Sequence, residues 1–433
     1  MNWKEEYKTL FWILGFFLFA YWMPVERLAF KEAIFSGLEL IKWYAREHVL
    51  LCLVPAFFIA GVIAVFVSQA AVIKYFGAGA KKWLSYAIAS VSGTVLAVCS
   101  CTILPLFSSI HKRGAGLGPA IAFLYSGPAI NILAIILTAR ILGWKLGVAR
   151  VVGAVFFSIV IGFIMHFIYR REEAEKAVAK LALPNDKINQ PFWQTAFHFF
   201  VLVFILIFAT WGKAETDSGL WFIIFTWKWI ITSLFGILLV LSLIFIVKLN
   251  KWHVFLATLF VIISSLIYPT QPLIPFTAAV LALTVILSID KNAAKEWMAE
   301  SWRFAKQILP LLAAGVLIAG FLLGSQEGSR GIVPDEWITG LVGGNSIYAN
   351  FFAAIVGAFM YFATLTEVPI LQGLIHAGMG QGPALALLLS GPAVSLPNML
   401  VIRSIIGTQK TAVYVTLVVT MATICGLIYG VLG

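Results

Sequence analysis

The sequence predicts an all-α polytopic membrane protein with two homologous repeats, each holding a broken or re-entrant hairpin, joined by four central spans. Two observations lead to this prediction: the composition and an internal duplication. Hydrophobic residues make up 61% of the 433 residues and charged residues only 11%, whereas a soluble domain carries about 25% charged residues. Apolar stretches of about 20 residues form membrane-spanning helices, because a helix satisfies the hydrogen bonds of its own backbone groups in lipid.

One stretch of the chain recurs at a constant offset. The segment CSCTILPLFSSIHKRGAGLGPAIAFLYSGPAIN begins at Cys99, and TLTEVPILQGLIHAGMGQGPALALLLSGPAVSLPN begins at Thr364. Ser126-Gly127-Pro128 in the first copy becomes Ser390-Gly391-Pro392 in the second, an offset of 390 − 126 = 264 residues. Gly/Pro-interrupted apolar segments in corresponding places of two halves point to the binding site of a transporter.

The elements follow in order from the apolar and charged stretches. Leu10–Met23 is apolar and is expected to be a first span, and the amphipathic stretch Glu26–Glu47 is expected to lie in the membrane interface. The chain then divides into this N-terminal part, the first repeat, a cytoplasmic linker, four central spans with an amphipathic connector, and the second repeat, at residues 1–48, 49–169, 170–194, 195–303 and 304–433.

The first repeat contains the segment that suggests a hairpin. Trp83–Ile110 is apolar but is interrupted at Cys99-Ser100-Cys101, and the arm after this break is too short to span a bilayer. We therefore expect a re-entrant hairpin with its tip at these residues and a matching tip near Thr364–Pro369. If the segment instead crosses as one broken helix, each repeat crosses an even number of times.

The basic residues predict how the repeats are oriented. Lys81, Lys82, Lys112 and Arg113 flank the first hairpin, whereas residues 343–383 contain no Lys or Arg. Arg140, Lys145 and Arg150 are counted with the connector that follows the first broken helix. Because cytoplasmic loops carry the excess of Lys and Arg, the two hairpins are expected to enter from opposite sides. The repeats are then inverted; with an even number of crossings they are parallel.

Two cysteines carry the sharpest chemistry. In a tight turn the sulfurs of Cys99 and Cys101 can converge, and paired thiolates suit soft species such as monovalent copper, zinc or trivalent arsenic. These two residues are therefore the candidate metal or metalloid ligands. Packing is the competing explanation, because a buried cysteine is usually a small inert hydrophobe. Four cysteines in the chain do not form a disulfide framework.

Polar groups at the helix breaks form the rest of the candidate site. Proline lacks a backbone N–H, so Pro105 and Pro128 each leave a carbonyl without its helical donor. The candidate solute-binding groups are these carbonyls together with neighbouring polar and small residues, namely Ser100, Thr102, Ser126, Gly127, Asn131, Ser390, Gly391 and Pro392. Helix packing is the alternative explanation for the small residues, because they let membrane helices approach closely.

Glu367, with Thr366 before it, is the outlier in the second copy. It lies in the apolar run YFATLTEVPILQGL. A carboxylate inside a membrane is costly, and by default it marks a functional site. We expect Glu367 to carry a proton or bind a cation; a neutral side chain that hydrogen-bonds a broken helix is the alternative.

Several function classes are excluded or lose support. The chain has no G-x-x-x-x-G-K-[ST] motif for an ATP motor, and no H-E-x-x-H or G-x-S-x-G motif. We therefore expect no enzymatic activity and no cofactor. The net charge of +11 needs no nucleic-acid partner, since basic loops beside membrane spans explain it.

The run VCSCTILPLFSSIHKRGAGLGPAIAFLYSGPAIN, together with TEVPIL and GPALALLLSGPA, resembles the ArsP/YraQ-type predicted permeases. Members of that family are inner-membrane permeases, and some export trivalent organoarsenicals such as methylarsenite. The resemblance implies a transport site at Cys99, Cys101, Pro105, Ser126–Pro128 and Asn131.

From the residues and the resemblance we expect a multi-pass permease of a prokaryotic inner membrane. Its partners would be the lipid bilayer, a small thiophilic solute such as a trivalent organoarsenical, and protons coupled through Glu367. The alternatives are a permease for another inorganic ion, sulfur species or metal, and a membrane-embedded thiol redox enzyme.

Overall fold

A computed structural model describes residues 3–67, 81–96, 100–181, 191–212, 219–290, 293–324, 331–332, 340–360, 367–376 and 378–432. Within these residues the regular structure is helical, apart from one isolated bridge between Gly343 and Met379. Five helices in this part of the chain are long and apolar enough to cross a membrane, or up to seven if each of two bent pairs is one span. The expectation of an all-α polytopic membrane protein is confirmed.

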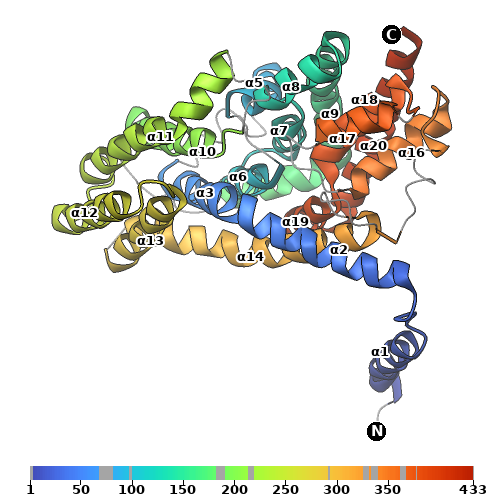
Figure 1. Ribbon diagram of the computed structural model, residues 1–433, viewed down its shortest axis with the longest axis horizontal. Coiled ribbons are helices and arrows are strands. Elements are labelled where there is room, and N and C mark those ends of the chain that lie inside the picture. The colour runs from blue at the N-terminus through green and yellow to red at the C-terminus, as the bar shows by residue number, and fades with distance from the viewer. Residues whose placement is uncertain are drawn as a thin grey trace.

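The N-terminal segments form one separate helix and one long run. Helix α1 (Trp3–Tyr21) projects away from the rest of the molecule (Figure 1). Helices α2 (Leu28–Tyr44), η1 (Ala45–Leu53) and α3 (Val54–Phe66) then form a continuous helical run of 39 residues. The interfacial helix expected at Glu26–Glu47 is therefore not separated from the span that follows it. The π-helical turns of η1 precede Pro55, which lacks the N–H of a regular α-helix.

From residue 81 on, the described part of the first half consists of five helices: α5 (Lys82–Leu96), α6 (Ser100–Lys112), α7 (Leu117–Ala129), α8 (Ile132–Ile141) and α9 (Trp144–Leu181). The α7–α8 pair is bent by 46° directly after Pro128. Helix α9 runs through Arg170, where the linker was expected to begin, and ends at Leu181. The stretch RREEAEKAVAKL supports this continuation, because Arg, Glu, Ala and Lys are strong helix formers.

The four central segments are helices α10 (Phe192–Ala209), α11 (Leu220–Phe245), α12 (Lys251–Ile267) and α13 (Leu273–Ile289). They pack as two neighbouring pairs, α10 on α11 and α12 on α13. Ile230, Leu234 and Ile237 are exposed on the outer face of α11, where a membrane protein meets lipid tails. These four helices form one end of the molecule (Figure 1).

Helix α14 (Ala293–Leu323) joins the central helices to the second half. It is one continuous helix, although a connector over Asp290–Lys306 and a separate span were expected. It packs along α2 and α3 (Figure 1). A Cβ atom at Gly320 would lie 2.8 Å from the Gly37 Cα atom, so the two glycines allow α2 and α14 to approach closely.

The second half repeats the helix order of the first. Its helices are α16 (Ile347–Phe359), α17 (Glu367–His376), α18 (Gln381–Val394), α19 (Leu396–Ile406) and α20 (Thr408–Leu432). The α18–α19 pair is bent by 45°. At the 264-residue offset, Gly114 and Gly378 have φ angles of 105° and 104°, and Gly143 and Gly407 have 99° and 89°.

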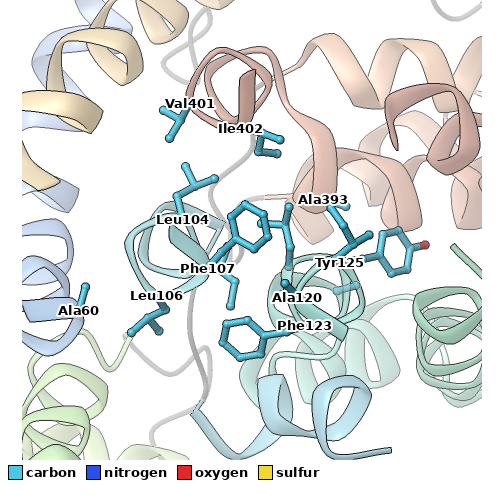
Figure 2. Packing of buried hydrophobic residues seen from close by; sticks show 14 of the residues in the cluster. Ala60, Leu104, Leu106, Phe107, Ala120, Phe123, Tyr125, Ala393, Val401 and Ile402 are labelled. Atoms are coloured by element: carbon cyan, nitrogen blue, oxygen red, sulfur yellow. The ribbon is translucent and has the colours of Figure 1, made fainter. Parts of the chain in front are cut away.

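The helix contacts match as well. Helix α7 packs on α5 and α9, and α18 packs on α16 and α20. Between the halves the contacts are exchanged: α6 of the first half packs on α19, and its counterpart α17 packs on α8. These correspondences support the duplication, while the inverted orientation stays a prediction. Part of the buried core between the halves comes from α6, α7 and α19 (Figure 2).

Candidate functional site

A fully buried ion pair joins the two halves of the molecule. The Nη2 atom of Arg150 donates to Oε1 of Glu367 at 2.5 Å, and both side chains are 0% exposed. Arg150 comes from α9 and Glu367 is the first residue of α17. Buried charges in proteins are paired because an isolated ion pays a large desolvation penalty.

The break between α7 and α8 holds the Arg150 guanidinium in place. Its Nε atom donates to the Ala129 carbonyl at 3.0 Å, and its Nη1 atom donates to Thr138 Oγ1 at 2.9 Å. Ala129 is the last residue of α7, and the last carbonyls of a helix have no intrahelical donor. Thr138 lies on α8 and donates its own proton to the Ala134 carbonyl at 2.6 Å. Arg150 therefore bridges the helix break and the carboxylate.

The second carboxylate oxygen of Glu367 is buried and has no hydrogen-bond partner among the residues that the structure describes. Glu367 starts α17, where a negative charge interacts favourably with the helix N-terminus. An oxygen without a partner at this depth is ready to accept a proton or a hydrogen bond from a solute. The site therefore contains an ion pair of zero net charge and one further acceptor atom, Oε2 of Glu367.

The second helix break also carries buried polar atoms without partners. These are the Ser395 Oγ and Asn398 Oδ1 atoms; the Tyr125 hydroxyl of α7, in the first half, is another such atom. The Asn398 amide donates to the Pro392 carbonyl at 3.4 Å. Unpaired buried polar groups are rare in folded proteins and call for an explanation. Ser395 and Asn398 place two of them at the second break, while others lie elsewhere in the described residues.

The expected thiol site falls mostly outside the described residues. Cys99 and Thr366 lie in undescribed segments, and the Cys101 side chain is likewise outside the description, although its backbone lies in the first turn of α6. Ser100 and Thr102 are buried in that same turn, and Pro105 lies inside α6. The dithiol site remains a prediction.

The two SGP motifs lie inside buried helices and make packing contacts. The Ser126 hydroxyl donates to the Ala89 carbonyl of α5 at 2.9 Å. A Cβ atom at Gly127 would lie 2.6 Å from Ile103 Cδ1, so this glycine lets α6 approach α7. Ser390 donates to the Leu387 carbonyl within its own helix.

The remaining site residues lie at or beside the two breaks. Gly391 and Pro392 are buried in the last turns of α18. Pro128 lies in the last turn of α7, and Asn131 is buried just after it, at the first break. The break itself supplies the polar groups that contact Arg150.

Arg150 is the residue that sequence reasoning missed. We counted it with the basic connector, but it is fully buried six residues after the start of α9 at Trp144. It therefore cannot count as a loop charge in the orientation argument. The signal was present, since a single Arg precedes the uncharged run VVGAVFFSIVIGFI, and a charge inside a span is a functional-site hypothesis.

Comparisons with known proteins show which family the chain resembles. The ArsP_1 model, described as a predicted permease, matches residues 34–431. The UPF0718 protein MJ0584 of Methanocaldococcus jannaschii is 42% identical over 391 residues, which cover 90% of this chain and 93% of that protein. The UPF0718 protein YraQ of Escherichia coli is 48% identical over 50 residues, 12% of this chain and 14% of that protein. No solved structure matches the chain.

Proposed function

The chain belongs to the ArsP_1 family of predicted permeases, and we propose that it is a secondary transporter that exports a small thiophilic solute, with trivalent organoarsenicals as the leading candidate. The observation that carries the transport mechanism is the buried Arg150–Glu367 pair at a helix break between the two halves. Charged groups inside membrane helices are rare and mark solute or proton pathways. We assign the protein to the inner membrane of a prokaryotic cell.

The proposed solute site combines soft and hard ligands. Cys99 and Cys101 would supply thiolates, which prefer soft species such as trivalent arsenic. A monosubstituted trivalent arsenical has two exchangeable positions, so two thiols can bind it together. Once the first bond forms, the second is effectively intramolecular, which strengthens the binding. The polar groups near the first break, including Ser126 and Asn131, would contact the rest of the solute.

Glu367 would couple transport to protons. Its side chain is 0% exposed and its Oε2 atom has no partner in the described part of the chain, so a proton can add there without breaking a hydrogen bond seen in the structure. A Glu367→Gln variant keeps the shape of the side chain but cannot ionise. In vesicles with an imposed pH gradient, this variant is expected to lose gradient-driven transport. Full gradient-driven transport by the variant would remove Glu367 from the coupling mechanism.

The thiol proposal is tested with cells that lack the gene and express each variant at matched membrane levels. Cys99→Ser and Cys101→Ser should each lose most arsenical tolerance and raise accumulation. Cys52→Ser is the matched control, because Cys52 is a buried core cysteine of η1, and it should retain tolerance. Wild-type efflux by the double Cys99→Ser/Cys101→Ser variant would contradict the dithiol site.

A screen of the deletion strain against other metals, metalloids and sulfur species tests the substrate class itself. The proposal requires that tolerance to trivalent organoarsenicals falls and that the cells accumulate them. Altered cellular thiol status without movement of any solute would instead favour a thiol redox enzyme.

A further inference from the structure

We propose that Arg150 is the coupling residue of this transporter, and that its ion pair with Glu367 is a latch between the two halves that opens when Glu367 takes up a proton. This inference rests on the proposed function, because it concerns how a proton moves the transport machinery. It assigns a role to Arg150, and it makes the break between α7 and α8 part of the moving unit.

Two corresponding helix contacts join the halves, and the latch lies at one of them. Helix α17 of the second half packs on α8, next to the Arg150–Glu367 pair. In the corresponding contact α6 packs on α19, where Leu104 of α6 lies beside Val401 and Ile402 (Figure 2). At the 264-residue offset, Glu367 corresponds to Ile103 and Arg150 to Tyr414. At these corresponding positions the fold therefore has uncharged side chains in one contact and an ion pair in the other.

Protonation of Glu367 would weaken its contact with Arg150 but leave the other hydrogen bonds of Arg150 in place. The proton would add to Oε2, the carboxylate oxygen without a partner. Glu367 then becomes a neutral acid, and its bond to Arg150 changes from a charge-paired bond to one with a single charged partner, which is weaker. Arg150 keeps its bonds to the Ala129 carbonyl and to Thr138. The carboxylate is released while the guanidinium stays anchored to the helix break.

Among the described residues, few other titratable groups lie near Glu367. On α17 itself the other titratable residue is His376, at the opposite end of the helix. Helix α18, which packs on α17, has none in its sequence, and the titratable residue of α8 is Arg140, which is exposed. Arg150 is the group that α9 contributes, and Tyr125 of α7 lies near enough to interact with Arg150. A pH response in the first turns of α17, away from His376, is therefore expected to come from the ion pair.

Hydrogen exchange of the purified full-length protein in lipid nanodiscs tests the latch without any solute. Exchange is measured at about pH 5.5 and about pH 8 and corrected for the intrinsic effect of pH on amide exchange. In the wild type, peptides from α17 are expected to exchange about tenfold faster at the lower pH. Peptides from residues 100–110 of α6, the part of the corresponding helix that contains no acidic residue, His, Lys or Arg, serve as the internal control and should not respond.

Three variants make the test decisive. Glu367→Gln should exchange fast in α17 at both pH values, because its side chain is permanently neutral. Arg150→Lys keeps the charge and should keep the pH response. The double variant Arg150→Met/Glu367→Leu removes both charges and should show slow exchange at both pH values. If Glu367→Gln fails to fold, the double variant still decides.

A pH response in the first turns of α17 that persists in the double variant, or an equal response in residues 100–110 of α6, would overturn the latch. Loss of arsenical export in the cell assays would not affect this measurement, which contains no arsenical. Conversely, a failed exchange experiment would leave the proposed substrate class standing. The two proposals can therefore fail separately.

Discussion

In the first half of the molecule the Arg150 side chain donates to the Ala129 carbonyl, and in the second half the Tyr414 hydroxyl donates to the Ala393 carbonyl. The two donors and the two acceptors are related by the same 264-residue offset. A side chain from the long helix thus satisfies the last turn before the bend in both halves. Only the first-half donor is charged, and it alone reaches across to a carboxylate. The comparison separates a shared feature, a side-chain donor to the broken helix, from the charge, which the second half lacks at this position.

A second comparison shows what the halves share. A Cβ atom at Gly118 would lie 2.8 Å from the Gly162 carbonyl oxygen, and one at Gly382 would lie 2.6 Å from that of Gly426. These positions correspond at the same offset. In each half, then, two glycines let two helices touch through backbone atoms: Gly118 and Gly162 between α7 and α9, and Gly382 and Gly426 between α18 and α20. We call these contacts the glycine seams, and their likeness is expected for features that serve packing. The halves agree at the seams and differ at the ion pair.

The largest expected effect concerns the side of the membrane that each half faces. Lys82 and Ser346 are exposed and correspond at the offset of 264 residues. If the repeats are inverted, single cysteines at these two positions should react with an impermeant maleimide from opposite sides, with Lys82→Cys labelled from the cytoplasm. A cysteine replacing Arg113 should share the side of Lys82. The background carries Ser in place of the native cysteines.

Labelling of the Lys82 and Arg113 positions from opposite sides would overturn the hairpin and make the repeats parallel. Lys82 and Arg113 are better probes than the nearby serines, because Ser85 and Ser109 are buried. Ser109 also donates to the Ala60 carbonyl at 3.0 Å.

The second-largest expected effect concerns how much stability is lost when one charge of the Arg150–Glu367 pair is left buried without its partner. Arg150→Met leaves Glu367 buried without its partner and is expected to destabilise the protein by about 3–5 kcal/mol. Arg150→Met/Glu367→Leu should recover most of that loss, because no charge stays buried. Tyr414→Phe is the matched change in the second half and should cost about 1 kcal/mol, the net value of one hydrogen bond. Thermal unfolding of the purified proteins in detergent, compared as Tm values, gives the order.

Equal losses of stability for Arg150→Met and Tyr414→Phe would contradict the difference between the charged donor of the first half and the uncharged donor of the second. A double variant as unstable as the single Arg150→Met variant would also contradict it, because the loss would then come from packing rather than from an unpaired charge.

The smallest effect tests the shared seams. Gly118→Ala and Gly382→Ala should each destabilise by about 1–3 kcal/mol, because the added methyl group would overpack two helices that touch through backbone atoms. Gly236 of α11 is the control, since a Cβ atom there meets nothing within 4 Å, and Gly236→Ala should leave stability unchanged or raise it by up to about 1 kcal/mol. Thermal unfolding measures all three. A large loss at only one seam would show that the halves are not packed alike.

Much of the fold could be predicted from the sequence because its causes are local. The apolar composition fixes the class of protein, and the glycines at positions 114 and 378 occur where the backbone needs a positive φ angle. Glu367 stood out because a charge in an apolar run is costly wherever the run folds. Continuity of the helices was harder to predict. The amphipathic part of α14 looks like a connector, but it becomes helix because its apolar side packs on α2 and α3.

The sequence by itself determined that this chain is a helical membrane protein with a duplicated, Pro-broken motif and one isolated carboxylate. Only the tertiary structure decided what that carboxylate binds. Arg150 and Glu367 are 217 positions apart, and no periodicity relates residues at that distance. Their pairing depends on α17 packing across the break between α7 and α8, where the Ala129 carbonyl and Thr138 orient the guanidinium. A charge can be recognised from its apolar neighbours in the chain, but its partner is set by how distant helices pack.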